Sequence, residues 1–188
     1  MPFLLFGSSG SGKTTLLDAI RGRVERLALH DFDEIGVPSD ATTAWRHEAN
    51  ERWLRRALGY QAEGIDMLLA GQTPVAEVLA APSAPLVDGL AACLLDCDDA
   101  ARTERLAQRP QVWGSVDEML RWAAWLRRHA ADVTYRLDVV GLTPDRLARW
   151  DGAVHVLDTT DAPVERSAAD LLAWIAAERR TGSRGIGA

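Results

Sequence analysis

The stretch LLFGSSGSGKTTLL, residues 4–17, indicates how the beginning of this chain folds. Its opening residues belong to a short apolar run over 2–6, which is typical of a buried parallel strand. The run stops at Gly7, and a tract of glycine and serine follows. An apolar pattern then resumes at Leu16, Ile20 and Val24, which share one face of a helix. The stretch therefore predicts a strand, a glycine-rich turn and a helix in succession.

The turn itself has the spacing of a phosphate-binding loop, G-x-x-x-x-G-K-[ST], and it lies between a strand and a helix as that motif requires. Lys13 is the only lysine of the chain, and every other Lys or Arg side chain is an arginine. A compact ammonium on a mobile stem suits the β and γ phosphates of a nucleotide. The Thr14 hydroxyl is a hard oxygen ligand that suits Mg²⁺. The residues predicted to wrap the phosphates are Gly7, Ser8, Ser9, Gly10, Ser11, Gly12, Lys13, Thr14 and Thr15.

Composition indicates one globular domain. The chain has 188 residues, of which 47% are hydrophobic and 26% charged, and a domain of this length needs neither disulfides nor a structural metal. Its net charge of −6 argues against broad capture of nucleic acid or of anionic membranes. Cys93 and Cys97 share one apolar run, so we expect buried free thiols in a reducing compartment. The N-terminus lacks the features of a signal peptide, which predicts a cytoplasmic protein.

Strand and helix patterns alternate along the chain. This alternation predicts an α/β fold in which helices cover both faces of a parallel sheet. The expected strands cover 2–6, 27–33, 65–71, 90–96 and 153–158, and the expected helices after the first cover 41–64, 74–81, 100–109, 116–130 and a segment beginning near 163. Asp98 or Asp99 is expected to cap the helix at 100. A single domain over 1–180 and a flexible tail over 181–188 are predicted.

The chain resembles the small P-loop phosphotransferases, the group of nucleoside monophosphate, shikimate, gluconate and adenylylsulfate kinases. The resemblance extends over the whole length, although only the P-loop (Walker A) motif is highly specific. It implies a three-layer fold with five parallel strands in the order 2-3-1-4-5 and a lid over about 99–130. It further implies use of ATP and Mg²⁺ to phosphorylate a small polar acceptor.

In such kinases an acidic residue after the second strand contacts the acceptor or serves the metal. Here Asp31 and Asp33 occupy that place, and a solvated acidic turn is the alternative. The third strand of several relatives ends in a carboxylate, whereas this one ends at Gly71 and Gln72. Metal binding is therefore assigned to Thr14 and Asp31. Gly71 is expected to let the acceptor approach the backbone, and Gln72 to hydrogen-bond it, unless the segment is a plain turn.

The resemblance also assigns arginines. Arg102, Arg105 and Arg109 lie on one side of the helix after the fourth strand, where lid arginines of these kinases neutralise the transferred phosphoryl group. Arg102 and Arg105 are the predicted catalytic pair, with Lys13, Asp31 and Asp33; a solvated helix face is the alternative. Arg46 on the long second helix is placed beside an anionic acceptor. After the fifth strand, the loop with Thr160, Asp161, Ala162 and Pro163 borders the adenine; Asp161 and Pro163 are its predicted nucleotide contacts.

The sequence thus predicts an ATP- and Mg²⁺-dependent phosphotransferase that acts by positioning and charge neutralisation. Trp113 is expected to pack near the lid hinge. Two alternatives remain at this stage: an ATPase coupled to a partner protein, and a kinase acting on nucleic-acid ends. The second would need a basic channel, which 21 basic against 27 acidic residues disfavours.

Overall fold

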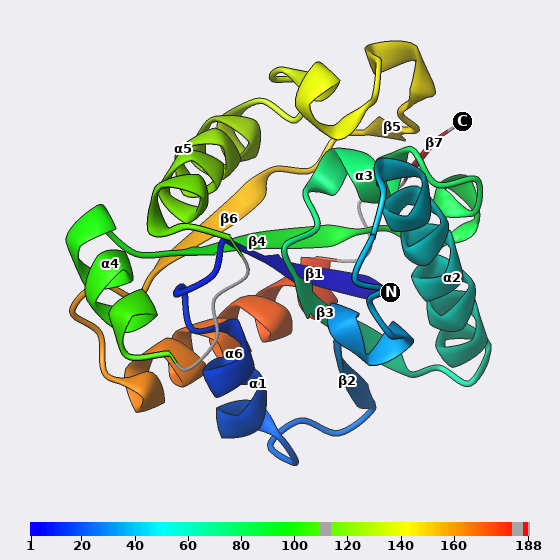
Figure 1. Cartoon of the computed structure of the whole chain (residues 1–188). Helices are drawn as coiled ribbons and strands as arrows, with labels where there is room; N and C mark the ends of the chain where they lie inside the picture. Colours follow the sequence, from blue (N-terminus) through cyan, green and yellow to red (C-terminus); the bar gives the residue numbers. More distant parts are fainter. Residues whose placement is uncertain (110–113, 182–185, 188) are drawn as a thin grey trace.

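A computed structural model describes residues 1–109, 114–181 and 186–187. Its centre is a five-stranded parallel sheet in the order β2-β3-β1-β4-β6 (Figure 1). The strands are β1 Pro2–Phe6, β2 Leu27–Asp31, β3 Asp66–Gly71, β4 Ala91–Asp96 and β6 Val154–Asp158. The predicted order 2-3-1-4-5 is confirmed, since the strand predicted fifth is β6. The extra label comes from the two-residue strand β5, Arg149–Trp150, which pairs with β7, Ile186–Gly187.

Helices cover both faces of the sheet, as the alternating pattern predicted (Figure 1). α1 (Lys13–Ile20) and α6 (Val164–Thr181) lie on one face. α2 (Thr43–Ala62), α3 (Val75–Leu79) and α5 (Val116–Ala131) lie on the other, and α4 (Asp99–Ala107) packs against α5. The short 3-10 turns are η1 Phe32–Ile35, η2 Ala84–Leu86, η3 Leu137–Val140 and η4 Pro144–Arg146. Asp98 caps α4 by accepting a hydrogen bond from Ala101 N at 2.7 Å, as expected.

The central strands are apolar throughout because each of their faces is buried. Phe3 and Leu5 of β1 point into a core formed with α1 and α6, whereas Leu4 and Phe6 point into a second core under α2, α3 and α5. Alternate residues of a strand face opposite sides, so one five-residue strand contributes to both cores. The carboxyl ends of these strands meet at one edge of the sheet, which is where the loops that carry the polar motifs begin.

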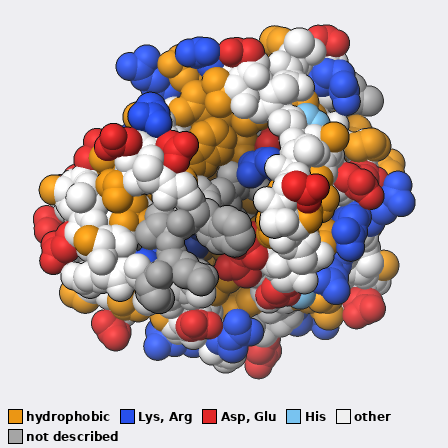
Figure 2. Space-filling model, viewed as in Figure 1, with side chains coloured by type: hydrophobic (Ala, Val, Ile, Leu, Met, Phe, Trp, Pro, Cys, Tyr) orange, Lys and Arg blue, Asp and Glu red, His pale blue; other side chains and the backbone are white. Residues whose placement is uncertain are grey.

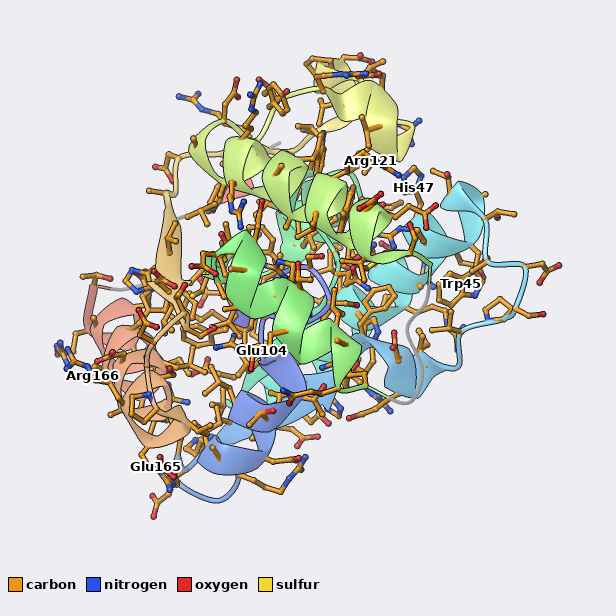
Figure 3. All side chains as sticks on the ribbon, turned by 60° about the vertical axis from the view of Figure 1, so that its left-hand side comes forward. Trp45, His47, Glu104, Arg121, Glu165 and Arg166 are labelled. Carbon is orange, nitrogen blue, oxygen red and sulfur yellow. The ribbon has the colours of Figure 1, made fainter. Side chains whose placement is uncertain are left out.

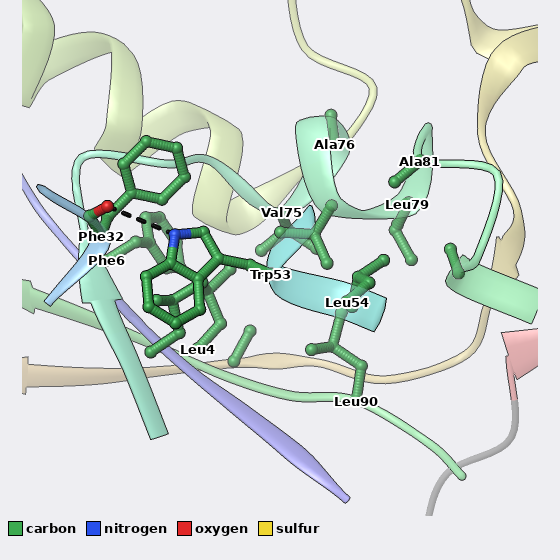
Figure 4. Packing of buried hydrophobic residues seen from close by; sticks show 14 of the residues in the cluster. Leu4, Phe6, Phe32, Trp53, Leu54, Val75, Ala76, Leu79, Ala81 and Leu90 are labelled. Carbon is green, nitrogen blue, oxygen red and sulfur yellow. Dashed lines mark hydrogen bonds between the residues drawn. The ribbon is translucent and has the colours of Figure 1, made fainter. Parts of the chain in front are cut away.

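The turn η1 is held in place by the core under α2, α3 and α5. The indole N–H of Trp53 in α2 donates to the Phe32 carbonyl oxygen at 3.2 Å (Figure 4). The Phe32 ring is buried and packs against Gly71, where an added Cβ would come within 2.7 Å of the Phe32 Cβ. Asp31 and Asp33 flank Phe32, so this packing also fixes the position of the two acids.

Some predictions fall partly or wholly outside the described residues. Trp113, expected near the lid hinge, is one of them. Of the predicted tail 181–188, Thr181 ends α6 and Ile186–Gly187 forms β7, while the rest of the tail is not described. The extents of the domain and of the lid stay predictions.

Candidate active site

The loop after β1 has the backbone geometry of a phosphate cradle. Gly10 and Gly12 have φ of +83° and +96°, a conformation that residues with side chains rarely adopt. Gly12 also begins α1, since its carbonyl oxygen accepts from Leu16 N at 2.9 Å. A Cβ on Gly7 would lie 2.3 Å from the Leu95 carbonyl oxygen, so that position has no room for a side chain. No side chain of the described residues caps α1, so the N–H groups of its first turn are available to bind an anion.

Lys13 extends back along this loop. Its Nζ donates to the carbonyl oxygens of Gly7 at 2.8 Å and Ser8 at 3.1 Å. Burial is the main cause that lowers the pKa of Lys13 to about 8; the cations Arg102 and Arg109 act in the same direction, while Asp31 and Asp33 oppose them. Within the described residues Lys13 forms no ion pair, and its ammonium is hydrogen-bonded only to neutral carbonyl oxygens. A phosphate would supply a negative charge and restore the ordinary pKa.

A pocket of about 380 Å³ opens beside the loop, a volume in the range of small-molecule sites. Its lining comes from three elements that are far apart in the sequence. The loop and α1 contribute Gly10, Gly12 and Thr15. The end of α4 and the residues after it contribute Arg105, Gln108 and Arg109. The loop after β6 and the start of α6 contribute Thr159, Ala162, Val164 and Ser167. The pocket lies where the sequence placed the nucleotide base, although Asp161 and Pro163 are not part of its lining and Thr159 is.

The three arginines of the predicted lid occupy different environments. Arg105 donates to the Thr159 hydroxyl at 2.9 Å and to the Thr159 carbonyl oxygen at 2.6 Å, and so joins α4 to the loop after β6 at the pocket wall. Arg109 follows the end of α4, is exposed, and lines the pocket within electrostatic range of Lys13. Arg109, which the sequence ranked last, is therefore the exposed arginine of the three at the pocket.

Arg102 lies in the protein interior instead of on a lid surface. Its side chain is fully buried; it pairs with Asp96 at the end of β4 and donates to the Ser9 carbonyl oxygen at 2.7 Å. Arg127 of α5 contacts the other oxygen of Asp96 at 2.5 Å. The role predicted for Arg102, closure over the phosphates, does not suit this position. Arg102 here positions the P-loop by holding the backbone of Ser9.

Asp31 and Asp33 lie within electrostatic range of Lys13 and do not line the pocket. Asp31 accepts from Asp33 N at 3.1 Å and caps η1, and its negative charge acts on Lys13. Partial desolvation and the neighbouring Asp31 raise the pKa of Asp33, against the opposing charges of Lys13 and Arg46. A carboxylate with a raised pKa in contact with solvent is suited to accept a proton.

The remaining acceptor-side residues are engaged with the protein. Glu77, itself buried, binds Arg46 through Nε at 3.0 Å and Nη2 at 2.7 Å, so most of the guanidinium charge is compensated there. The Gln72 side chain donates to the Ser9 hydroxyl at 3.3 Å and thereby contacts the P-loop. Gly71 was expected to leave room for the acceptor. In the structure Phe32 fills the space beside Gly71, so packing explains why this position is a glycine.

No protein-family model and no curated protein matches the chain in sequence. Solved structures match it nearly end to end. The match to a sugar kinase from Janibacter sp. HTCC2649 includes 93% of this chain and 94% of the sugar kinase, with 16% identity and a TM-score of 0.64. The match to a gluconokinase from Sinorhizobium meliloti 1021 includes 96% of this chain and 95% of the gluconokinase, with 17% identity and a TM-score of 0.58. The chain has the fold of small P-loop kinases.

In this P-loop fold, a metal would depend on the nucleotide for most of its ligands. Thr14 is exposed at the start of α1, as a Mg²⁺ ligand must be. Within the described residues, no three His, Cys, Asp or Glu side chains come together as a preformed metal site. Mg²⁺ commonly takes one or two protein oxygens and completes its shell with phosphates and water, so Thr14 with Asp31 or Asp33 fits that ion.

Two interactions that position the P-loop were not anticipated from the sequence. Asp96 at the end of β4 pairs with Arg102, which contacts the loop, and with Arg127; its place at the carboxyl edge of the sheet signals such a role. Ser8 donates its hydroxyl to the Met119 carbonyl oxygen at 2.9 Å, which ties the loop to the first turn of α5. No local pattern signals this contact, because 111 residues separate the two partners.

None of the described helices has the length and hydropathy needed to cross a membrane.

Proposed function

We propose that the protein is an ATP- and Mg²⁺-dependent kinase that phosphorylates a hydroxyl of a small polar acceptor. The observation that carries this proposal is the position of Lys13, which follows Gly12 at the wall of a nucleoside-sized pocket, here called the base pocket, and lies within electrostatic range of Asp31 and Asp33. A nucleotide with its base in the pocket would place its phosphates on the P-loop, with the γ-phosphate toward the two acids. The likeness of the fold to a solved sugar kinase and a solved gluconokinase supports phosphoryl transfer as the reaction.

The transfer moves one phosphoryl group. The acceptor oxygen forms a bond to the γ-phosphorus while the bond between that phosphorus and the β,γ-bridging oxygen of ATP breaks, which leaves ADP. The hydroxyl proton passes to Asp33, whose raised pKa suits a base. Lys13 and Arg109 neutralise the charge that spreads over the transferred group. Mg²⁺, held by Thr14 and Asp31 with the nucleotide, adds charge stabilisation when bound.

A phosphoryl-transfer screen tests the proposal. Labelled ATP is incubated with pools of hydroxyl-bearing metabolites and, separately, of oligonucleotides. We expect transfer to a metabolite pool and a loss in Lys13→Ala of about 2–4 kcal/mol in transition-state stabilisation. Arg166→Ala is the matched control, because Arg166 is an exposed cation on α6 that does not line the base pocket (Figure 3). Turnover that needs no acceptor but responds to a protein would favour a coupled ATPase and contradict the proposal.

A further inference from the structure

A second hollow, of about 490 Å³, runs along α5 and is separate from the base pocket. We call it the α5 groove. One wall is a face of α5 with Arg121, Trp122, Trp125 and Arg128, and the other is the segment with Tyr135 and Arg136 that leads into η3. Figure 2 shows hydrophobic atoms gathered in the hollowed part of this face, with basic side chains near its rim.

Three parallel aromatic rings lead from the core to the wall of this groove. The His129 and Trp125 rings are 4.7 Å apart and inclined by 11°, and the Trp125 and Trp122 rings are 4.7 Å apart and inclined by 6°. His129 is fully buried, Trp125 is 8% exposed, and Trp122 is only partly buried. Burial lowers the pKa of His129 to about 4, so the inner ring is neutral at pH 7. The stack therefore ends at a ring on the groove wall, and a planar ligand would extend it.

The charge of the groove is positive although the chain is acidic. Arg121, Arg128 and Arg136 line it against a single carboxylate, Glu118. That carboxylate is occupied by the N-cap of α5, where it accepts from Ser115 N at 2.6 Å. Arg128 lies over the Tyr135 ring at 5.7 Å, and Arg136 pairs with Asp138 at 3.0 Å. Arg121 is exposed and forms no ion pair within 4 Å among the described residues, although it lies within electrostatic range of Glu118. An anionic group would complement the positive charge of these arginines.

The helix that lines the groove also contacts the P-loop. Met119, whose carbonyl oxygen accepts from Ser8, lies between the lining residues Glu118 and Arg121, about one helical turn before Trp122. The opposite wall rests on α2 near the acceptor-side residues, since His47 hydrogen-bonds the Val140 carbonyl oxygen at 3.0 Å. A ligand stacked on Trp122 would thus lie on the side of the loop to which phosphoryl transfer is directed.

From these contacts we infer that the α5 groove binds the phosphoryl acceptor, and that this acceptor carries a planar ring together with an anionic group. The ring stacks on Trp122 and the anion meets Arg121 at the groove rim. The inference rests on the proposed kinase function and names its substrate class. Aromatic acids and nucleoside monophosphates share this chemistry, whereas sugar acids supply the anion without the ring.

Binding is tested with 1-naphthyl phosphate, 1-naphthol and inorganic phosphate, in the presence of Mg²⁺ and a saturating non-hydrolysable ATP analogue that occupies the base pocket. We expect the ring-bearing phosphate to bind at least tenfold more tightly than either fragment. Loss of one stacked ring corresponds to about 5- to 150-fold in affinity, so Trp122→Ala should weaken binding within that range while Trp122→Phe changes it by less than threefold. Equal affinities in the wild type and in Trp122→Ala would overturn the inference.

A second variant protects the test against misfolding, because Trp122 also packs against the core. Arg121→Ala at an exposed position should weaken the phosphate-bearing probe at least fivefold and leave 1-naphthol unchanged, with Arg166→Ala as its control. In the acceptor screen, labelled phosphate should go to ring-bearing anions. Transfer to sugar acids alone would overturn the groove assignment and uphold the kinase, whereas nucleotide binding unaffected by Lys13→Ala would contradict the kinase itself.

Discussion

Lys13 offers a direct measurement of the P-loop electrostatics, because lysine labelled with ¹³C and ¹⁵N gives a single signal in this chain. The structure predicts a titration midpoint near pH 8 in the nucleotide-free protein, against an ordinary value of 10.5. With that midpoint, about half of the molecules carry a neutral lysine at pH 8 and about nine tenths at pH 9. Nucleotide phosphates require the ammonium, so binding must take up the missing proton.

Two assays check this magnitude. NMR titration of the labelled Lys13 should show the midpoint near 8 without nucleotide and above 10 with Mg²⁺ and an ATP analogue. Calorimetry in buffers of different ionisation enthalpy should then detect uptake of about 0.1 proton at pH 7 and about 0.9 at pH 9. Lys13→Met is the control, since it cannot take up that proton. A midpoint near 10.5 in the free protein would refute the account of a desolvated lysine without a negative partner.

The same shift has a consequence for stability. The folded protein releases the Lys13 proton at a lower pH than the unfolded chain does, so between about pH 8 and 10.5 the unfolded chain binds more protons. The free energy of unfolding contributed by Lys13 therefore rises with pH over that interval and is constant below it. Chemical denaturation of wild type and Lys13→Met at pH 7 and pH 10 measures this difference. A free energy of unfolding that falls from pH 7 to pH 10 in the wild type relative to Lys13→Met would contradict the predicted direction of the effect.

Three further changes separate chemistry from packing. Asp33→Asn should lower kcat about 10²–10⁴-fold with little effect on nucleotide Kd, and the wild-type kcat should rise with pH through the raised pKa of Asp33; unchanged kcat would contradict the base assignment. Arg102→Met should lower the free energy of unfolding by about 3–5 kcal/mol in urea denaturation, because it breaks a buried ion pair, whereas Arg109→Ala should leave stability within about 0.5 kcal/mol and weaken nucleotide binding. Gly71→Ala should destabilise by about 1–3 kcal/mol, since its Cβ would meet Phe32 at 2.7 Å; a melting temperature equal to the wild type would show that η1 yields freely.

Much of the fold could be predicted because its signals are local. A short apolar run that ends at a glycine predicted β1, and the pattern from Leu16 onward predicted α1. The strand order was carried by the resemblance to P-loop phosphotransferases, and the structure confirms it. By contrast, strands of two residues such as β5 and β7 carry no periodic pattern, because they exist through pairing with each other across the chain.

The sequence by itself determined the P-loop, since its glycines, lysine and threonine act through their own backbone geometry and charge. Only the tertiary structure decided which arginines lie at the pocket beside the P-loop. Helical spacing put Arg102 and Arg109 on one side, but α4 ends at Ala107, and its rotation against β4 buries Arg102 on Asp96 and leaves Arg109 at the pocket. That rotation depends on side chains from β4, α5 and the P-loop packing at one point. Residues so far apart in the chain leave no local pattern by which their meeting could be read.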